Sequence, residues 1–227
     1  MFKNILDFWR GKDFMSQVLE EFESMLDKSK EMFDLVCRRL IYNEEVAGLE
    51  EKIYALDKNI NELEKDIRKR TAEHLVLRPS VDVSTSLLLM SVVKDAERLG
   101  DYCKNLYEVI KLLDRPLDRR IYSNIFDAMD KKISDFFSKT KKVFRESDEQ
   151  GAMLLWEYER KIVKECDRII ETLTKSSFSV NQAVCFALIA RHFKRLTAHL
   201  ANIGTSVVLP ISDLDYFDER RKENDKG

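Results

Sequence analysis

The chain has 227 residues, with 39 Lys and Arg, 41 Asp and Glu, six Gly and only three Pro. A net charge of −2 excludes a general electrostatic attraction to nucleic acid or to an anionic membrane surface, so no nucleic-acid partner is expected. Charged residues at 35% beside hydrophobic residues at 44% exclude a disordered chain and indicate a buried core. Because β and doubly wound α/β proteins need Gly and Pro at their turns, the scarcity of both favours an all-α fold with short connections.

The first ten residues are interrupted by charges and lack the cleavage site of a secretory signal. No window approaches the roughly 18 consecutive apolar residues of a membrane-spanning helix. The four cysteines stand alone, without a C-x-x-C pair, so we expect buried thiols in a reduced, cytoplasmic protein. A short apolar patch near the start is expected to cap the bundle or, alternatively, to contact a membrane-associated partner. It consists of Phe2, Ile5, Leu6, Phe8 and Trp9.

Apolar residues that recur at steps of three and four predict six long helices. The most regular run, from Val46 to Ile67, alternates these steps without a gap, as in coiled coils and long bundles. Pro79 interrupts the first half and Pro116 ends it. Helices of about 30 residues would be about 45 Å long, which is typical of a bundle. The expected helices cover residues 14–42, 46–67, 87–113, 121–144, 154–173 and 180–208.

An internal repeat divides the chain into two halves. The sequence E-R-L-G-D-Y-C-K-N-L at 97–106 recurs as K-R-L-T-A-H-L-A-N-I at 194–203, an offset of 97 residues. Each copy falls in the last expected helix of its half, which supports a tandem arrangement. We therefore predict two three-helix repeats. They span residues 1–114 and 115–211, and a charged tail follows at 212–227.

These motifs resemble those of the PhoU family, phosphate-uptake regulators built from two three-helix repeats. The segment 97–108 is similar to the family signature E-R-[IM]-[GA]-D-x-A-x-N-[IV]-A-E, and 56–63 is similar to D-x-x-I-D-x-L. In the second half, 190–202 resembles A-R-H-x-E-R-I-x-D-H-x-x-N. The sequence departs from the family at Lys194 and Ala198, where Glu and Asp are usual, and at Asn61, which replaces an Asp.

Three acidic residues of the first half are candidate metal ligands. Glu97 and Asp101 are four residues apart, so both leave one helical face about 6 Å from each other. Asp57 lies beside the apolar seam of the preceding helix. Carboxylates between helices suit hard or borderline cations, and the resemblance implies a cluster of iron or another divalent or trivalent metal at Glu97, Asp101 and Asp57. The alternative is a set of solvated acids with Arg98 close by.

The second half is expected to bind no metal, because Lys194 and Ala198 replace two oxygen donors with an ammonium and a methyl group. Two registers are open for its middle helix. The counterparts of Asp57 and Asn61 are either Asp167 and Glu171, which are then weaker ligand candidates, or Glu159 and Val163.

Three further residues have structural interpretations. His192 and His199 are about 10 Å apart along a helix, too far to chelate one ion, so we expect packed, hydrogen-bonded side chains. Gly100 lies inside a helix, where Gly costs up to about 1 kcal/mol relative to Ala. We expect close packing against a neighbouring helix to offset this cost.

The sequence predicts a binding protein rather than an enzyme. It lacks the Glu-x-x-His pairs of di-iron bundles, the G-x-S-x-G elbow, the P-loop and the dinucleotide-binding turn. The resemblance implies a regulator that contacts a phosphate ABC transporter ATPase, a membrane sensor kinase or both, and that reaches the membrane through them. The long helices also allow a homodimer. The alternatives are an accessory of a sodium- or proton-coupled phosphate permease, and a metal-dependent enzyme or metal store.

Overall fold

The computed structural model describes residues 13–77 and 83–209 of the chain. The described residues form helices and no strand, so the predicted all-α class is confirmed. The apolar patch predicted at residues 2–9 and the tail at 212–227 lie outside this part of the chain. The helices are α2 (Asp13–Leu40), α3 (Leu49–Leu77), α4 (Val83–Leu112), α5 (Arg119–Phe126), α6 (Met129–Glu146), α7 (Glu149–Thr174) and α8 (Val180–Thr205).

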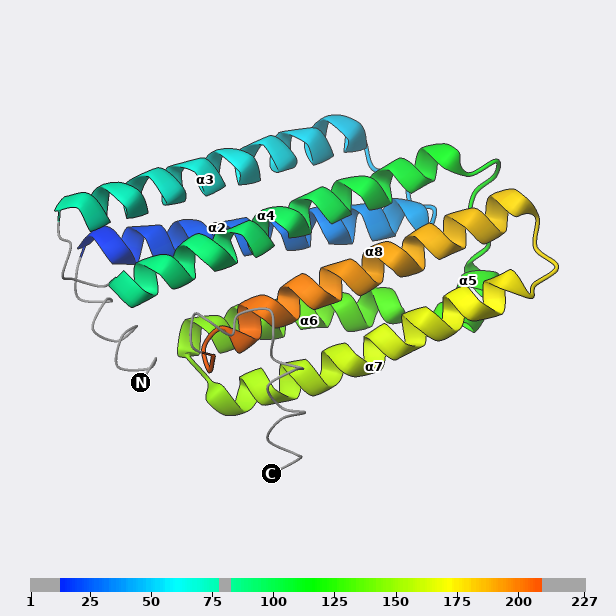
Figure 1. Ribbon diagram of the computed structural model, residues 1–227. Coiled ribbons are helices and arrows are strands. Elements are labelled where there is room, and N and C mark those ends of the chain that lie inside the picture. The colour runs from blue at the N-terminus through cyan, green and yellow to red at the C-terminus, as the bar shows by residue number, and fades with distance from the viewer. Residues whose placement is uncertain (1–12, 78–82, 210–227) are drawn as a thin grey trace, which may run out of the picture.

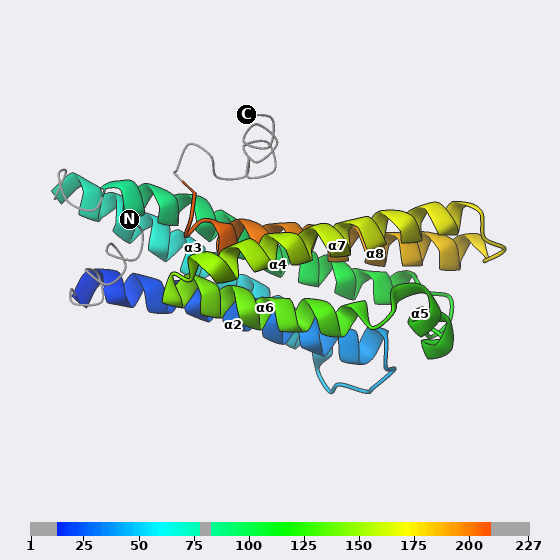
Figure 2. The ribbon, with the colours of Figure 1, turned by 90° about the horizontal axis from the view of Figure 1, so that it is seen from below.

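The long helices form two layers. In Figure 1, α3, α4, α8 and α7 lie side by side in the front layer, and α2 and α6 lie behind them; Figure 2 shows the two layers edge-on. Helices α2, α3 and α4 pack together, and so do α6, α7 and α8. The two sets meet where α4 contacts α8 and where α2 contacts α6. The helices that carry the repeated motif therefore make the central contact of the bundle.

The helix expected at 121–144 is broken into α5 and α6, so the prediction of one continuous helix there is wrong. Asp127 and Ala128 connect the two pieces with φ angles of 44° and 54°, in the left-handed region that ends a right-handed helix. Asp118 caps the start of α5 by accepting hydrogen bonds from the backbone N–H groups of Arg120 and Ile121. The described chain thus has seven helices instead of the six expected from periodicity.

A buried carboxylate anchors the start of α6 just after this break. The Asp130 carboxylate accepts hydrogen bonds from the hydroxyls of Tyr42, at 2.6 Å, and Tyr122, at 3.0 Å. Asp130 is only 4% exposed, and its position in the first turn of α6 also places it at the positive end of the helix dipole. The network joins the turn that follows α2 to helices α5 and α6.

The core follows the apolar periodicity of the sequence. Ile53, Ile60 and Ile67 of the predicted seam are buried on α3. Aromatic side chains join the two halves across the second layer: the rings of Phe22 and Phe144 are 4.8 Å apart. All four cysteines are buried and free, as predicted. None of the described helices combines the length and apolar character that a membrane crossing requires.

Candidate functional site

The three candidate acids of the first repeat lie along the contact between α3 and α4. Gly100 allows the two helices to approach closely there, because a Cβ at this position would lie 3.1 Å from Ile60 Cδ1 and 3.9 Å from Asp57 Oδ1. The predicted close packing at Gly100 is thus confirmed. It brings Asp57 of α3 beside the turn of α4 that carries Asp101.

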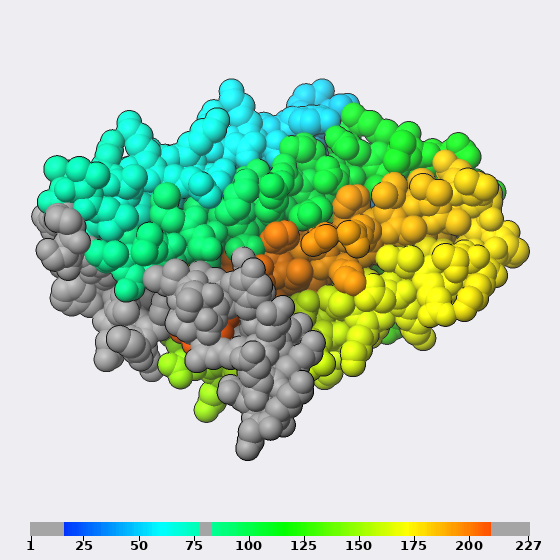
Figure 3. All heavy atoms as spheres, viewed as in Figure 1, coloured from blue at the N-terminus to red at the C-terminus, as the bar shows by residue number. Residues whose placement is uncertain are grey.

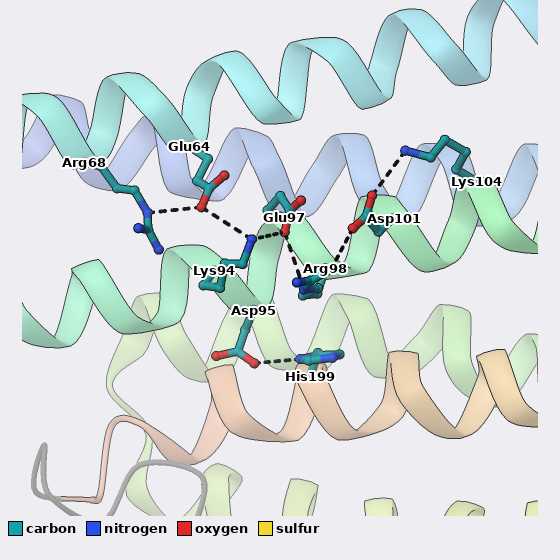
Figure 4. Close-up of polar contacts among 9 residues, drawn as sticks. All are labelled: Glu64, Arg68, Lys94, Asp95, Glu97, Arg98, Asp101, Lys104 and His199. Carbon is teal, nitrogen blue, oxygen red and sulfur yellow. Dashed lines mark hydrogen bonds and ion pairs between the residues drawn. The ribbon is translucent and has the colours of Figure 1, made fainter.

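A lysine bridges Asp57 and Asp101. The Lys104 ammonium donates to Asp57 Oδ2 at 2.9 Å and to Asp101 Oδ1 at 3.2 Å. The second Asp101 oxygen accepts a hydrogen bond from the Arg98 guanidinium at 3.0 Å. Figure 4 shows the Lys104 and Arg98 groups on either side of the Asp101 carboxylate. The structure therefore brings these two acids together, but through an ammonium group that sequence reasoning did not single out.

Glu97 belongs to a second set of charges one turn away. Its carboxylate accepts a hydrogen bond from Lys94 at 2.9 Å and lies 3.8 Å from Arg98 Nε. Lys94 is also 4.0 Å from Glu64 of α3, which in turn pairs with Arg68 at 3.0 Å. As Figure 4 shows, acids and bases alternate along this face. Each acid here contacts at least one cation of the same chain.

These contacts do not resemble a metal centre. Along residues 13–77 and 83–209, no group of three or more His, Cys, Asp or Glu side chains is placed to hold a metal ion. Glu97, Asp101 and Asp57 instead contact ammonium and guanidinium groups. The arrangement supplies paired charges that join α3 and α4. Metal binding at these three residues stays a prediction.

The register of the second repeat follows from two contacts between a second and a third helix. In the first repeat, the ring of Tyr107 on α4 meets that of Tyr54 on α3 at 6.4 Å. Gly204 follows Tyr107 by 97 residues, and a Cβ at Gly204 would lie 2.5 Å from Leu155 Cδ1 on α7. Leu155 is therefore the counterpart of Tyr54.

This register favours one of the two predicted alternatives. Asp57 follows Tyr54 by three residues, and Glu159 follows Leu155 by four. Glu159 therefore lies within one residue of the position equivalent to Asp57. The pair Glu159 and Val163 therefore fits the counterparts of Asp57 and Asn61, whereas Asp167 lies two helical turns further along α7.

The other two candidates of the second repeat have their own partners. The Asp167 carboxylate accepts hydrogen bonds of 2.6 and 2.8 Å from Lys194 of α8. Glu171 accepts one from Lys175 at 2.7 Å, and both of these side chains are largely exposed. Lys194 thus contacts the middle helix from the position that corresponds to Glu97. Asp167 and Glu171 thus pair with two different lysines.

The contact of α4 with α8 contains a polar pair that the motif analysis missed. The Nδ1–H of His199 donates to Asp95 Oδ1 at 2.7 Å, and the Asn202 amide donates to the same oxygen at 3.2 Å. Figure 4 shows this bond crossing from α4 to α8. The expected packed and hydrogen-bonded state of His199 is confirmed. Asp95 had a sequence signal, because the offset of 97 residues pairs it with His192.

A second contact between α4 and α8 involves the ring of Tyr102 on α4 and the two histidines of α8. The Tyr102 ring lies 5.5 Å from that of His199 and 6.0 Å from that of His192. Since Asp95 corresponds to His192 and Tyr102 to His199, the contacts Asp95–His199 and His192–Tyr102 are equivalent under the repeat. The halves thus pack with approximate two-fold symmetry.

His192 is packed but not fully hydrogen-bonded. Its Nδ1 atom is buried and has no hydrogen-bond partner in the described part of the chain. Burial lowers the pKa of His192 to about 4, and the charge of the adjacent Arg191 contributes in the same direction. The ring is therefore neutral near pH 7. The expected packing is confirmed for His192, but the expected hydrogen bond at Nδ1 is not found.

Comparison with known proteins agrees with the predicted resemblance. Residues 22–110 match the PhoU domain family. They cover most of α2, the whole of α3, and α4 as far as its last turn. A phosphate-specific transport system accessory protein PhoU homolog of Synechocystis is 27% identical over 161 residues, which are 69% of this chain and 71% of that protein. PhoU homolog 1 of Thermotoga maritima, with the same description, is 26% identical over 204 residues, covering 80% and 83%.

Two solved structures share the fold. PhoU from Pseudomonas aeruginosa superposes with a TM-score of 0.73 at 16% identity and covers 86% of this chain and 95% of its own. The phosphate transport system regulatory protein PhoU from Streptococcus pneumoniae has a TM-score of 0.71 at 19% identity, with the same coverage. The helical bundle of this chain is therefore that of the PhoU structures.

Proposed function

Since residues 22–110 of this chain are a PhoU domain, we propose that the protein is an accessory protein of a phosphate uptake system and regulates it by direct contact. The domain match is the observation that carries the proposal. The names of the two relatives, each a phosphate-specific transport accessory protein, point the same way. The partner is the ATPase of a phosphate ABC transporter, a membrane sensor kinase or both. The protein then works in the cytoplasm and reaches the membrane through its partner.

A broad surface is available for such a contact. The layer of α3, α4, α8 and α7 forms one continuous face of the molecule in Figure 3. One of its two inner helices, α8, contains no Asp or Glu over Val180–Thr205. Arg191 and Arg195 are exposed on α8 and have no ion-pair partner among the described residues. These two arginines, flanked by paired charges, suit an acidic partner surface, because complementary charges steer association and fix orientation.

The mechanism is binding without turnover. A partner that exists in two conformations is shifted toward the one that this protein binds more tightly, and the size of the shift is set by the difference in affinity. The acids Glu97, Asp101 and Asp57 are engaged by Lys and Arg side chains, which does not favour general acid–base chemistry. A homodimer would place two such surfaces on one regulator.

An affinity capture tests the proposal. Tagged protein is recovered from native membranes of phosphate-replete cells after crosslinking, and its partners are identified by mass spectrometry. We expect a phosphate-transporter ATPase or a sensor kinase, lost when Arg191 and Arg195 are both changed to Glu. The control is Lys131→Glu, which reverses an exposed charge on α6 in the other layer.

Each outcome has a clear meaning. Capture of the ATPase or kinase by the wild type and the control, but not by the double variant, supports both the function and the surface. Capture of a single phosphate permease favours the accessory role for a sodium- or proton-coupled carrier. If no membrane protein is captured, the regulatory proposal is wrong and the metal-store alternative becomes the one to test.

A further inference from the structure

Lysines on the third helix of each repeat contact carboxylates on the second helix. Lys104 of α4 meets Asp57 of α3, and Lys194 of α8 meets Asp167 of α7. The first of these contacts lies where the resemblance to PhoU proteins implies metal ligands. We propose that Lys104 takes the place of a metal ion between α3 and α4, so that the carboxylates of Asp57 and Asp101 need no divalent cation.

The position of the Lys104 ammonium is that of a bridging cation. It lies 2.9 Å from an oxygen of Asp57 and 3.2 Å from an oxygen of Asp101, and so joins two helices as a shared metal would. Its side chain is 22% exposed, and those of the two acids are 12% and 26% exposed. Because this site is mostly shielded from water, the charge of Lys104 is only partly screened. A metal ion beside it would be repelled.

The ammonium stays charged at neutral pH. Burial by itself lowers the pKa of Lys104, but its hydrogen bonds to Asp57 and Asp101 and the charges of both acids outweigh burial, so that the net pKa is raised. Arg98 adds a second positive charge at 3.0 Å from the other Asp101 oxygen. A metal at Asp101 would therefore lie beside two cations of the chain, which repel it.

The neighbouring acid and the second repeat show the same arrangement with different residues. Lys94 lies between Glu97, at 2.9 Å, and Glu64, at 4.0 Å, which again joins α4 to α3. In the second repeat, Lys194 stands at the position of Glu97 itself and bonds Asp167. In both repeats a lysine of the chain is the cation between the second and third helices. The two lysines, Lys104 and Lys194, do not occupy equivalent positions of the repeat.

Metal titration of the purified full chain tests the proposal without reference to any partner. The protein is stripped with EDTA and titrated anaerobically with Mn²⁺ and Fe²⁺. Retained metal is measured by plasma mass spectrometry, and the melting temperature by circular dichroism. We expect the wild type to retain no stoichiometric metal and to melt at the same temperature with and without Mn²⁺.

The decisive variant is Lys104→Met, which removes the charge but keeps an unbranched apolar side chain. It leaves two carboxylates close together, so we expect the melting temperature to fall by about 4 °C and Mn²⁺ to restore part of this loss. Lys58→Met is the matched control, because Lys58 is 79% exposed and its one ion-pair partner among the described residues is Glu62 of the same helix, at 3.8 Å. The control should change neither property.

Two results overturn the proposal. One is a wild-type chain that retains stoichiometric Mn²⁺ or Fe²⁺ and loses it in the Asp101→Asn variant. The other is a Lys104→Met variant that neither loses stability nor gains metal, since Lys104 would then not be the group that neutralises the two acids. The proposal is supported if the wild type retains no metal and the Lys104→Met variant either melts at a lower temperature or binds Mn²⁺.

Discussion

Asp95 of α4 and His199 of α8 form a hydrogen bond of 2.7 Å across the contact between the two repeats. Asp95 is 9% exposed and also accepts the amide of Asn202 at 3.2 Å. Buried carboxylates that accept several hydrogen bonds are costly to remove, because each donor loses its partner. This pair, and not the apolar seam alone, fixes how α4 and α8 meet.

Replacing Asp95 by Ala should lower the free energy of unfolding by about 2 kcal/mol, because His199 and Asn202 are left without an acceptor. Urea unfolding followed by circular dichroism measures the change. The control is Asp135→Ala, which removes an exposed pair with Lys139 and should cost less than about 0.5 kcal/mol. Equal effects of the two variants would contradict a structural role for the Asp95 contact.

His192 should make the protein less stable as the pH falls from about 6.5 to 4. The folded chain holds its pKa at about 4, whereas the unfolded chain binds the proton near the ordinary value. Protons therefore favour the unfolded state within this window, and the stability lost is about 1–2 kcal/mol after allowance for partial exposure.

The variant His192→Phe keeps an aromatic ring against Tyr102 and should remove this part of the pH dependence. Urea titrations at several pH values between 4 and 7 compare the two proteins. If the variant shows the same slope as the wild type, another group causes the acid sensitivity.

The tyrosines that bond Asp130 should make the protein less stable at alkaline pH. Burial, together with the Asp130 carboxylate, raises the pKa of both Tyr42 and Tyr122. The unfolded chain releases these protons near pH 10, so stability is present below about pH 10 and falls as the pH rises further. The variants Tyr42→Phe and Tyr122→Phe should each weaken this fall. Absorbance at 295 nm, which follows tyrosine ionisation, should show a late-titrating fraction that shrinks in both variants.

Ala128→Gly should stabilise the protein by about 1 kcal/mol, because glycine adopts the left-handed φ of 54° found there without steric cost. Thermal and urea unfolding measure the gain. Ala187→Gly, inside α8, is the control and should cost about 1 kcal/mol, because the backbone there is helical. A loss of stability at both positions would mean that Ala128 is not held in the left-handed region.

The sequence was sufficient to predict the helices, and the break between α5 and α6 shows where periodicity fails. Apolar residues keep their helical spacing through Asp127 and Ala128, and no Gly or Pro marks the left-handed turn. The buried Asp130 network that holds the turn joins residues 88 positions apart, and spacing along the chain contains no information on such a contact.

The sequence motif identifies the acidic residues of the candidate site but not the cations that contact them. The motif predicts Glu97 and Asp101 on one face of a helix and Asp57 beside the apolar seam of the preceding helix. The structure joins Asp57 and Asp101 through Lys104, and pairs Glu97 with Lys94 one turn away. Their role as metal ligands stays a prediction. The motif does not predict the role of Lys104, three residues after Asp101, because its contact with Asp57 depends on how α3 and α4 align. Asp95 could have been found by applying the 97-residue offset to His192.

The two-fold arrangement of the repeats also determines which half can pair with which. If two copies of the first repeat met through α4, the same symmetry would set Asp95 against Tyr102, and two second repeats would set His192 against His199. Only the mixed pairing brings a carboxylate opposite an imidazole. Each repeat is therefore better matched to the other repeat than to a second copy of itself. Because both repeats belong to one chain, the matching repeat is always present at a high effective concentration.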